Sequence, residues 1–163
     1  PQLFPGCPES GEACLQRYRA WMDDYIRENG VPVKPGLREL LAWLKQAHIL
    51  CAVATSTFTN VAIGYLKNAG VLNCFAAIVG GDQVTKSKPD PEIFQLAMRA
   101  LGKQTPETCV VFEDSRNGLL AGANGGFPVI VVPDLFDPTL ELPGLCYAKC
   151  ARLDEAIDVI QNS

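Results

Sequence analysis

Short apolar runs that alternate with helix-like segments constrain the fold of this chain most strongly. Apolar runs of strand length lie at residues 49–54, 75–79, 109–112 and 129–132. Apolar positions at helical spacing lie at residues 37–44, 62–69, 90–101, 119–123 and 153–160. Strands that are apolar throughout are buried on both faces, and their alternation with helices is typical of parallel sheets with right-handed crossovers. We therefore predict an α/β fold, with a Rossmann-like three-layer α/β/α parallel sheet.

The first part of the chain is predicted to be a separate helix. Leu15, Tyr18 and Met22 recur at helical spacing over residues 12–28, and Asn29-Gly30 is a typical helix end. A linker rich in proline and glycine follows at residues 31–36. We place a domain boundary here, which divides the chain into residues 1–32 and residues 33–163.

Composition narrows the class of partner. The chain has 163 residues, a formal net charge of −4 and no run of basic residues, so it is not expected to bind nucleic acid. Seven cysteines without a Cys-x-x-Cys pair favour reduced thiols in a reducing compartment. The sequence has no apolar run long enough to cross a membrane and no signal-peptide pattern. We expect a cytoplasmic protein with no membrane partner.

Polar side chains follow three of the predicted strands. Thr55 and Ser56 follow the first, Gly81-Asp82 the second, and Glu113-Asp114 ends the third. In open parallel sheets, ligands bind beyond the carboxyl ends of the strands. The sequence therefore predicts one site at this edge of the sheet.

Each candidate residue has a functional and a structural interpretation. Thr55 and Ser56 are suited to donate to a phosphate oxygen, or to cap the next helix. Lys88, followed by Pro89, is suited to neutralise a phosphate and a carboxylate together, or to be a solvated loop lysine. Adjacent carboxylates at Glu113-Asp114 suit Mg²⁺, and helix capping by Asp114 or Ser115 is compatible with that role.

Four segments in this order and spacing resemble the haloacid dehalogenase (HAD) superfamily. They are Ala52–Ser56, Gly80–Val84, Lys88–Phe94 and Val111–Ser115 with Gly118. The resemblance is to the subgroup that contains β-phosphoglucomutases and small sugar-phosphate phosphatases. It implies a HAD-like core over residues 33–163 and makes residues 1–32 the C-terminal remnant of an α-helical cap.

The same resemblance implies roles for the site residues. Thr55 and Lys88 would be catalytic, and Thr55, Ser56 and Lys88 would bind phosphate. Asp114 would be a direct Mg²⁺ ligand, and Glu113 would hold metal-bound water in the second shell. The expected cofactor is Mg²⁺, and the expected partner is a small phosphorylated substrate.

One part of the family pattern is missing. The family begins with an Asp-x-Asp motif at the end of its first, central strand, where the first Asp attacks phosphorus and the second is the general acid and base. No Asp-x-Asp occurs in the 163 residues. We expect a truncated form whose core lacks its first strand and nucleophile.

Loss of a central strand would leave two edges with unpaired N–H and C=O groups. The flanking strands would close together, another chain would fill the slot, or a further segment of the protein would do so. Self-association through the exposed sheet edges and low stability of the isolated chain are therefore expected.

The function that these residues favour is a Mg²⁺-dependent phosphatase that acts on a small phosphorylated metabolite through an aspartyl-phosphate. A phosphohexomutase of the same superfamily is an alternative, because the same core serves both. A catalytically inactive binding or regulatory relative is a further alternative. The chain alone is expected to be inactive, whereas its parent protein would be a phosphoric monoester hydrolase.

Overall fold

The structure is a computed structural model that describes residues 11–162, and the chain divides into two compact units, Pro1–Pro32 and Val33–Ser163. The first unit contains helix α1 (Gly11–Asn29). The helix ends where the Gly30 N–H donates to the Ile26 carbonyl, and none of its residues is buried. The predicted helix over residues 12–28 is confirmed, and its identity as part of a cap stays a prediction.

Parallel strands form the centre of the second unit. Strands β1 (Ala52–Ala54) and β2 (Ala77–Val79) pair in parallel. Strand β4 (Val129–Val131) pairs in parallel with β3 (Val111–Glu113) on one side and with β5 (Ala148–Lys149) on the other. The predicted α/β class with parallel sheets is therefore confirmed.

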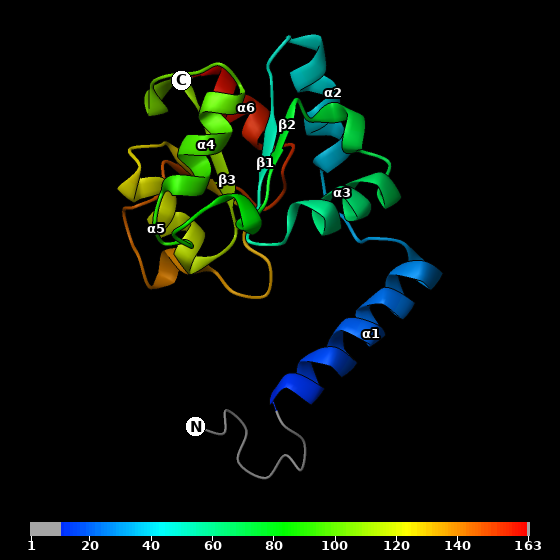
Figure 1. Cartoon of the computed structure of the whole chain (residues 1–163). Coiled ribbons are helices and arrows are strands. Elements are labelled where there is room, and N and C mark those ends of the chain that lie inside the picture. The colour runs from blue at the N-terminus through cyan, green and yellow to red at the C-terminus, as the bar shows by residue number, and fades with distance from the viewer. Residues whose placement is uncertain (1–10, 163) are drawn as a thin grey trace. The chain divides into compact units, whose positions relative to one another are not determined.

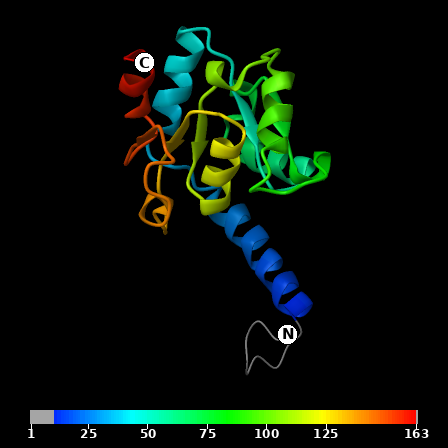
Figure 2. The ribbon, with the colours of Figure 1, turned by 90° about the vertical axis from the view of Figure 1, so that its left-hand side faces the viewer.

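Helices cover both faces of these strands (Figures 1 and 2). Helices α2 (Leu37–Gln46) and α6 (Ala156–Gln161) pack together over one face. Helices α4 (Glu92–Ala100) and α5 (Arg116–Asn124) lie over the other face, with α4 on β1 and β2 and α5 on β3 and β4. Helix α3 (Thr59–Asn68) connects β1 to β2. Short 3-10 helices lie in the connections: η1 (Leu72–Cys74), η2 (Gly81–Gln83), η3 (Pro106–Thr108) and η4 (Pro138–Leu140).

Strand β4 shows why the unit has three layers. Val129 and Val131 face the cluster that contains Phe94 and Leu119, on the side of α4 and α5. Ile130 and Val132 face the second cluster, on the side of α2 and α6. Because successive side chains of a strand point to opposite faces, an apolar run fills both cores at once.

Within residues 11–162, the strands form two sheets rather than one. The hydrogen-bonded orders are β1-β2 and β3-β4-β5, and β1 and β3 do not pair in the described residues. Of the three outcomes expected for a missing central strand, closure of the flanking strands is therefore not what the structure adopts.

Some element bounds differ from the sequence prediction. The strands are shorter than the apolar runs: Ile49 and Leu50 precede β1 and are exposed. Strand β5 was not predicted, because its two ladder residues, Ala148 and Lys149, carry no apolar pattern. Its main-chain pairing with β4 defines it instead.

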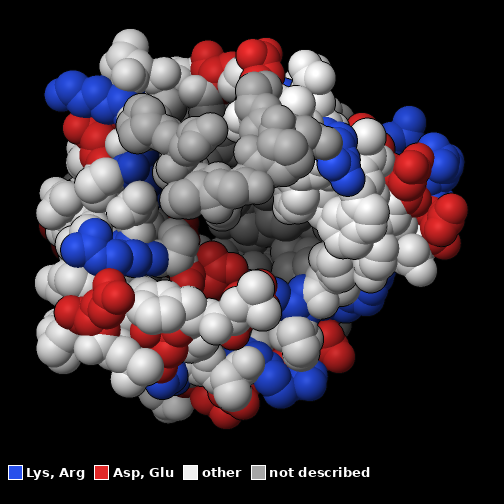
Figure 3. All heavy atoms as spheres, turned by 90° about the horizontal axis from the view of Figure 1, so that it is seen from below, with Lys and Arg blue, Asp and Glu red and all other residues white. Residues whose placement is uncertain are grey.

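The cysteines, the helices and the surface charges of the described residues also bear on the sequence predictions. The six cysteines among them are free, and Cys7 lies outside the described part of the chain. No helix between residues 11 and 162 has the length and apolar character that crossing a membrane requires. Basic and acidic side chains lie next to one another over the face drawn in Figure 3.

Candidate functional site

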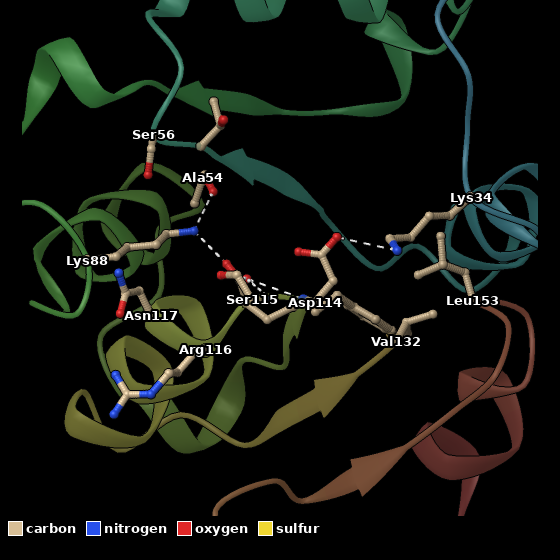
Figure 4. A pocket seen from close by; sticks show the side chains of 13 residues that line it. Lys34, Ala54, Ser56, Lys88, Asp114, Ser115, Arg116, Asn117, Val132 and Leu153 are labelled. Carbon is tan, nitrogen blue, oxygen red and sulfur yellow. Dashed lines mark hydrogen bonds and ion pairs between the residues drawn. The ribbon is translucent and has the colours of Figure 1, made fainter. Parts of the chain in front are cut away.

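The carboxyl ends of β1 and β3 open into one cavity of about 710 Å³. Figure 4 shows that its walls come from the loop after β1, the loop before α4 and the turn between β3 and α5. The cavity is lined by Lys34, Ala54, Thr55, Ser56, Lys88, Phe112, Glu113, Asp114, Ser115, Arg116, Asn117, Val132 and Leu153. It therefore brings together every residue that the sequence predicted for phosphate and metal binding: Thr55, Ser56, Lys88, Glu113 and Asp114. Their roles stay predictions.

Lys88 connects the two sheets at this edge. Its ammonium nitrogen lies 3.2 Å from the Ala54 carbonyl oxygen of β1 and 2.5 Å from Oε1 of Glu113 on β3. The side chain is 10% exposed, and Nζ lies 4.5 Å from the ring centroid of Phe94. A solvated loop lysine is therefore excluded. An ammonium has three N–H bonds, so the third remains for an anion in the cavity.

The loop that carries Lys88 is held by the first residue of α4. The Glu92 carboxylate accepts from the Thr85 N–H at 3.1 Å and from the Lys86 N–H at 2.8 Å. These hydrogen bonds lower the pKa of Glu92, with the Thr85 N–H as the main cause. The Asp90 side chain accepts from the Glu92 N–H at 3.0 Å, and Pro91 occupies the N-cap position of α4.

Glu113 is a buried carboxylate with partners on both oxygens. Its side chain is 9% exposed, and Oε2 accepts from the Ser115 hydroxyl at 3.0 Å. The Ser115 hydroxyl in turn accepts from the Gly118 N–H at 3.0 Å and so caps α5, as predicted. A Cβ at Gly118 would lie 1.9 Å from Oε2 of Glu113. Only a glycine there lets the helix start approach the carboxylate this closely.

Asp114 differs from its neighbour because its side chain is 41% exposed and faces the cavity. Its Oδ2 lies 3.3 Å from Nζ of Lys34, which also lies 3.7 Å from Oδ2 of Asp134. Asp114 is therefore the carboxylate that is accessible to a cation. Glu113 is turned toward Lys88 instead.

These donors fit Mg²⁺ better than a metal that needs a complete protein cage. Within residues 11–162 there is no cluster of three or more His, Cys, Asp or Glu side chains that could hold a metal. Structural zinc sites need about four protein ligands. Mg²⁺ uses one or two carboxylates, and takes waters and substrate phosphate oxygens for the rest. Asp114 would supply such a carboxylate, and Glu113 would contact water bound to the metal rather than the metal itself.

The loop after β1 presents hydroxyl groups to the same cavity. The Thr55 N–H extends the sheet by donating to the Val79 carbonyl at 3.0 Å. Its hydroxyl oxygen accepts from the Thr57 N–H at 3.1 Å, which leaves the hydroxyl hydrogen to donate into the cavity. A Cβ at Gly81 would lie 2.4 Å from the Ser56 carbonyl oxygen. The Gly80-Gly81 pair therefore lets this loop lie against the end of β2.

The start of α3 is held by Asp82 rather than by Thr55 or Ser56. Oδ1 of Asp82 accepts from the Thr59 N–H at 2.7 Å and from the Thr59 hydroxyl at 2.8 Å. The Thr59 hydroxyl is the main cause of a lowered pKa at Asp82. Thus the capping alternative for Thr55 and Ser56 is not what the structure adopts, and both remain available to a ligand.

Sequence reasoning missed one residue of the site, Lys34, and one residue that holds the neighbouring start of α3, Asp82. Lys34 was assigned to the linker, yet it reaches Asp114 from a distant part of the chain. Asp82 was recognised only as a polar residue at a strand end, and its contact with Thr59 was not predicted. The local signal for Asp82 was its position directly after Gly80-Gly81, at the end of a predicted strand. No local signal pointed to Lys34, because its partner is 80 residues away in sequence.

Known proteins with related sequence include a phosphorylated carbohydrates phosphatase of Thermotoga maritima. The two are 42% identical over 103 residues, which cover 63% of this chain and 45% of the relative. The chain also resembles Protein CbbY of Cereibacter sphaeroides, with 38% identity over 122 residues, 73% of this chain and 53% of the relative. The chain thus spans about half the length of these curated relatives.

A comparison of folds also finds CbbY. The crystal structure of CbbY from Rhodobacter sphaeroides in complex with phosphate matches with a TM-score of 0.76 and 30% identity. The match covers 92% of this chain and 67% of that one. The family model for haloacid dehalogenase-like hydrolases matches residues 4–126, which is more than half of the sequence. The chain therefore belongs to the haloacid dehalogenase-like hydrolase family.

Proposed function

We propose that this chain forms the phosphate- and metal-binding part of a Mg²⁺-dependent phosphatase that acts on a small phosphorylated metabolite through an aspartyl-phosphate. The observation that carries the proposal is the position of Lys88, between the Ala54 carbonyl and the Glu113 carboxylate at the carboxyl ends of both sheets. A buried ammonium with one N–H to spare favours an anionic ligand beside it.

Each residue of the cavity would make a different contact with a bound phosphoryl group. Lys88 would neutralise one of its oxygens, while the Thr55 hydroxyl and the main chain of Ser56 would donate to others. Asp114 would hold Mg²⁺, which when bound neutralises charge on the phosphoryl group. Glu113 would fix Lys88 in place. A cytoplasmic location, which suits small phosphorylated metabolites, stays a prediction.

The two carboxylates of the cavity do not supply a nucleophile. Glu113 is paired with Lys88 and Ser115, and Asp114 is the proposed metal ligand. An aspartyl-phosphate mechanism needs a further carboxylate, and the sequence contains no Asp-x-Asp. We therefore expect the 163-residue chain to bind phosphate esters without turning them over. A binding or regulatory role of the chain itself remains the second candidate on this ground.

Phosphorylated carbohydrates are the substrate class to test first. The Thermotoga maritima relative is named for them, and the CbbY structure holds phosphate. A phosphohexomutase would use the same binding groups, so the product has to be identified when turnover is seen.

Calorimetric titration of glucose 6-phosphate into the chain, with and without Mg²⁺, tests the proposal. We expect saturable binding that Mg²⁺ strengthens, and a loss of about tenfold in affinity in Thr55→Val, as for one hydrogen bond to a charged group. Asp114→Asn should remove the effect of Mg²⁺ and leave the Mg²⁺-free affinity intact. Equal affinity of the wild type, Thr55→Val and Asp114→Asn under both conditions would refute the proposed site.

A further inference from the structure

Lys34 lines the candidate site but has no part in the proposed function. Its Nζ lies 3.3 Å from Oδ2 of Asp114, 3.7 Å from Oδ2 of Asp134 and 3.5 Å from the Pro133 carbonyl oxygen. Figure 4 shows Lys34 and Lys88 reaching into the cavity from opposite sides. Carboxylate and carbonyl oxygens are also the donors that hard cations such as Mg²⁺ prefer. The Lys34 ammonium is thus a cation of the chain itself that lies among such oxygens.

The other basic side chains that line the cavity pair with different carboxylates. Lys88 lies against Glu113, and Nε of Arg116 lies 3.1 Å from Oε2 of Glu141. Among residues 11–162, the ion pair given for Asp114 is the one with Lys34. The charge of the proposed metal ligand is therefore offset by Lys34, and not by the lysine that is proposed to contact the phosphoryl group.

The main chain around Lys34 is fixed, so its side chain is the part that can move. The Leu153 N–H donates to the carbonyl of Pro35, the next residue, at 3.0 Å. Gly36 has a φ of +81°, and a Cβ there would lie 1.9 Å from Oδ1 of Asp154, so the chain turns tightly against that loop. From a fixed Cα, the flexible four-carbon stem of a lysine lets the ammonium move between neighbouring oxygens without leaving the cavity.

The charges around Lys34 favour a cation rather than an anion beside it. One ammonium lies between two carboxylates, those of Asp114 and Asp134, so the three groups together carry one negative charge. This charge repels a substrate anion and attracts a divalent cation. A metal ion at Asp114 would in turn repel the ammonium, because like charges a few ångströms apart interact strongly in a partly buried site. Asp134, whose side chain is 67% exposed, lies close enough to keep the ammonium when it leaves Asp114.

We propose that Lys34 competes with Mg²⁺ for Asp114 and so sets the Mg²⁺ concentration at which the site fills. This inference rests on the metal role of Asp114 in the proposed function. Without metal, the ammonium neutralises Asp114 and holds the carboxylate in the cavity. With metal, the ammonium stays beside Asp134 and the Pro133 carbonyl. The metal affinity of the site is therefore set by residue 34 as well as by the ligand itself.

Titration of the full chain with Mn²⁺, followed by the electron paramagnetic resonance signal of free Mn²⁺, tests the inference without any turnover. Mn²⁺ takes the same oxygen ligands as Mg²⁺, and no phosphate is present. Lys34→Met removes the charge and keeps the length of the side chain, whereas Lys34→Arg keeps the charge. Lys45→Met is the matched control, because Lys45 is an exposed lysine in the last turn of α2, about 15 Å along the helix from its start.

We expect Lys34→Met to bind Mn²⁺ about three- to tenfold more tightly than the wild type, as for removal of a cation from beside a carboxylate. Lys34→Arg and Lys45→Met should stay within about twofold of the wild type. Asp134→Asn is a second variant, and it leaves the ammonium with Asp114 alone. It should weaken Mn²⁺ binding in the wild type more than in Lys34→Met, because the two residues act through the same ammonium.

The outcomes separate this inference from the proposed function. Equal affinity of the wild type and Lys34→Met, with binding lost in Asp114→Asn, would overturn the role of Lys34 and leave the metal site standing. Equal tightening in Lys34→Met and Lys45→Met would mean a general effect of net charge and would also overturn it. Mn²⁺ binding that is unchanged in Asp114→Asn, or absent from all variants, would overturn both the role of Lys34 and the proposed metal site.

Discussion

The two ends of the space between β1 and β3 differ in how they are held. At the carboxyl end, Lys88 joins the sheets through the Ala54 carbonyl and the Glu113 carboxylate. Along the rest of its length, the sheets face each other across an apolar groove, which Ala52 and Phe112 line, without pairing in the described residues. Hydrogen bonds and charge thus hold the site together where the sheet itself is interrupted. The site geometry therefore depends on a few side chains that can be changed one at a time.

The largest effect is expected from breaking the buried ion pair. Lys88→Met leaves Glu113, which is 9% exposed, without its ammonium partner. Removal of one partner of a buried pair costs about 3–5 kcal/mol. Urea denaturation should show a loss of this size. Lys86→Met, at an exposed lysine of the same loop, is the control and should change stability by under about 0.5 kcal/mol. Similar losses in both variants would contradict the account.

A pair of proline substitutions should separate the paired edge of β1 from its open edge. The Val53 N–H lies on the side of β1 that pairs with β2, and the Ala52 N–H faces the groove. Val53→Pro removes a ladder hydrogen bond, whereas Ala52→Pro removes a donor from an open edge, where proline is tolerated. We expect Val53→Pro to be less stable than Ala52→Pro by about 1–3 kcal/mol in chemical denaturation. Equal costs would indicate that β1 is paired on both sides.

A change of comparable size should come from crowding Glu113. The Cβ of Gly118→Ala would lie 1.9 Å from Oε2, so the carboxylate or the helix start has to move. Overpacking of this kind costs about 1–3 kcal/mol. Gly64→Ala is the matched control within a helix, since its Cβ would meet nothing within 4 Å, and it should be neutral or stabilising. Thermal unfolding of both variants measures the difference, and destabilisation by Gly64→Ala as large as that by Gly118→Ala would argue against this contact.

The smallest effect is expected at Asp82, and it should depend on pH. Hydrogen bonds from Thr59 lower the pKa of Asp82 in the folded state. A carboxylate with a lowered folded pKa stabilises the fold above its ordinary pKa of about 4, and that contribution disappears as the pH falls through the folded value. The stability difference between the wild type and Asp82→Asn should therefore be full at pH 6 and shrink below about pH 4. A difference that grows as the pH falls would have the wrong sign.

Much of the fold could be predicted from local patterns. Apolar periodicity identified the helices and four of the strands. Burial on one face of a helix requires apolar residues at helical spacing, and burial on both faces of a strand requires a continuous apolar run. The residues at strand ends identified Thr55, Glu113 and Asp114 as neighbours, and the family resemblance added Lys88. Strand β5, the contact of Lys34 with Asp114 and the division of the strands into two sheets could not be predicted. These features depend on main-chain pairing and on contacts between segments far apart in sequence.

The most direct test of an interrupted sheet is amide hydrogen exchange along β1 and β3 in the monomeric chain. The account predicts alternation within single strands: slow exchange at Val53 and Glu113, which donate to β2 and β4, and faster exchange at Ala54 and Phe112, which face the groove. Uniformly slow exchange at all four positions would mean that β1 and β3 are paired along both edges, and would contradict the account.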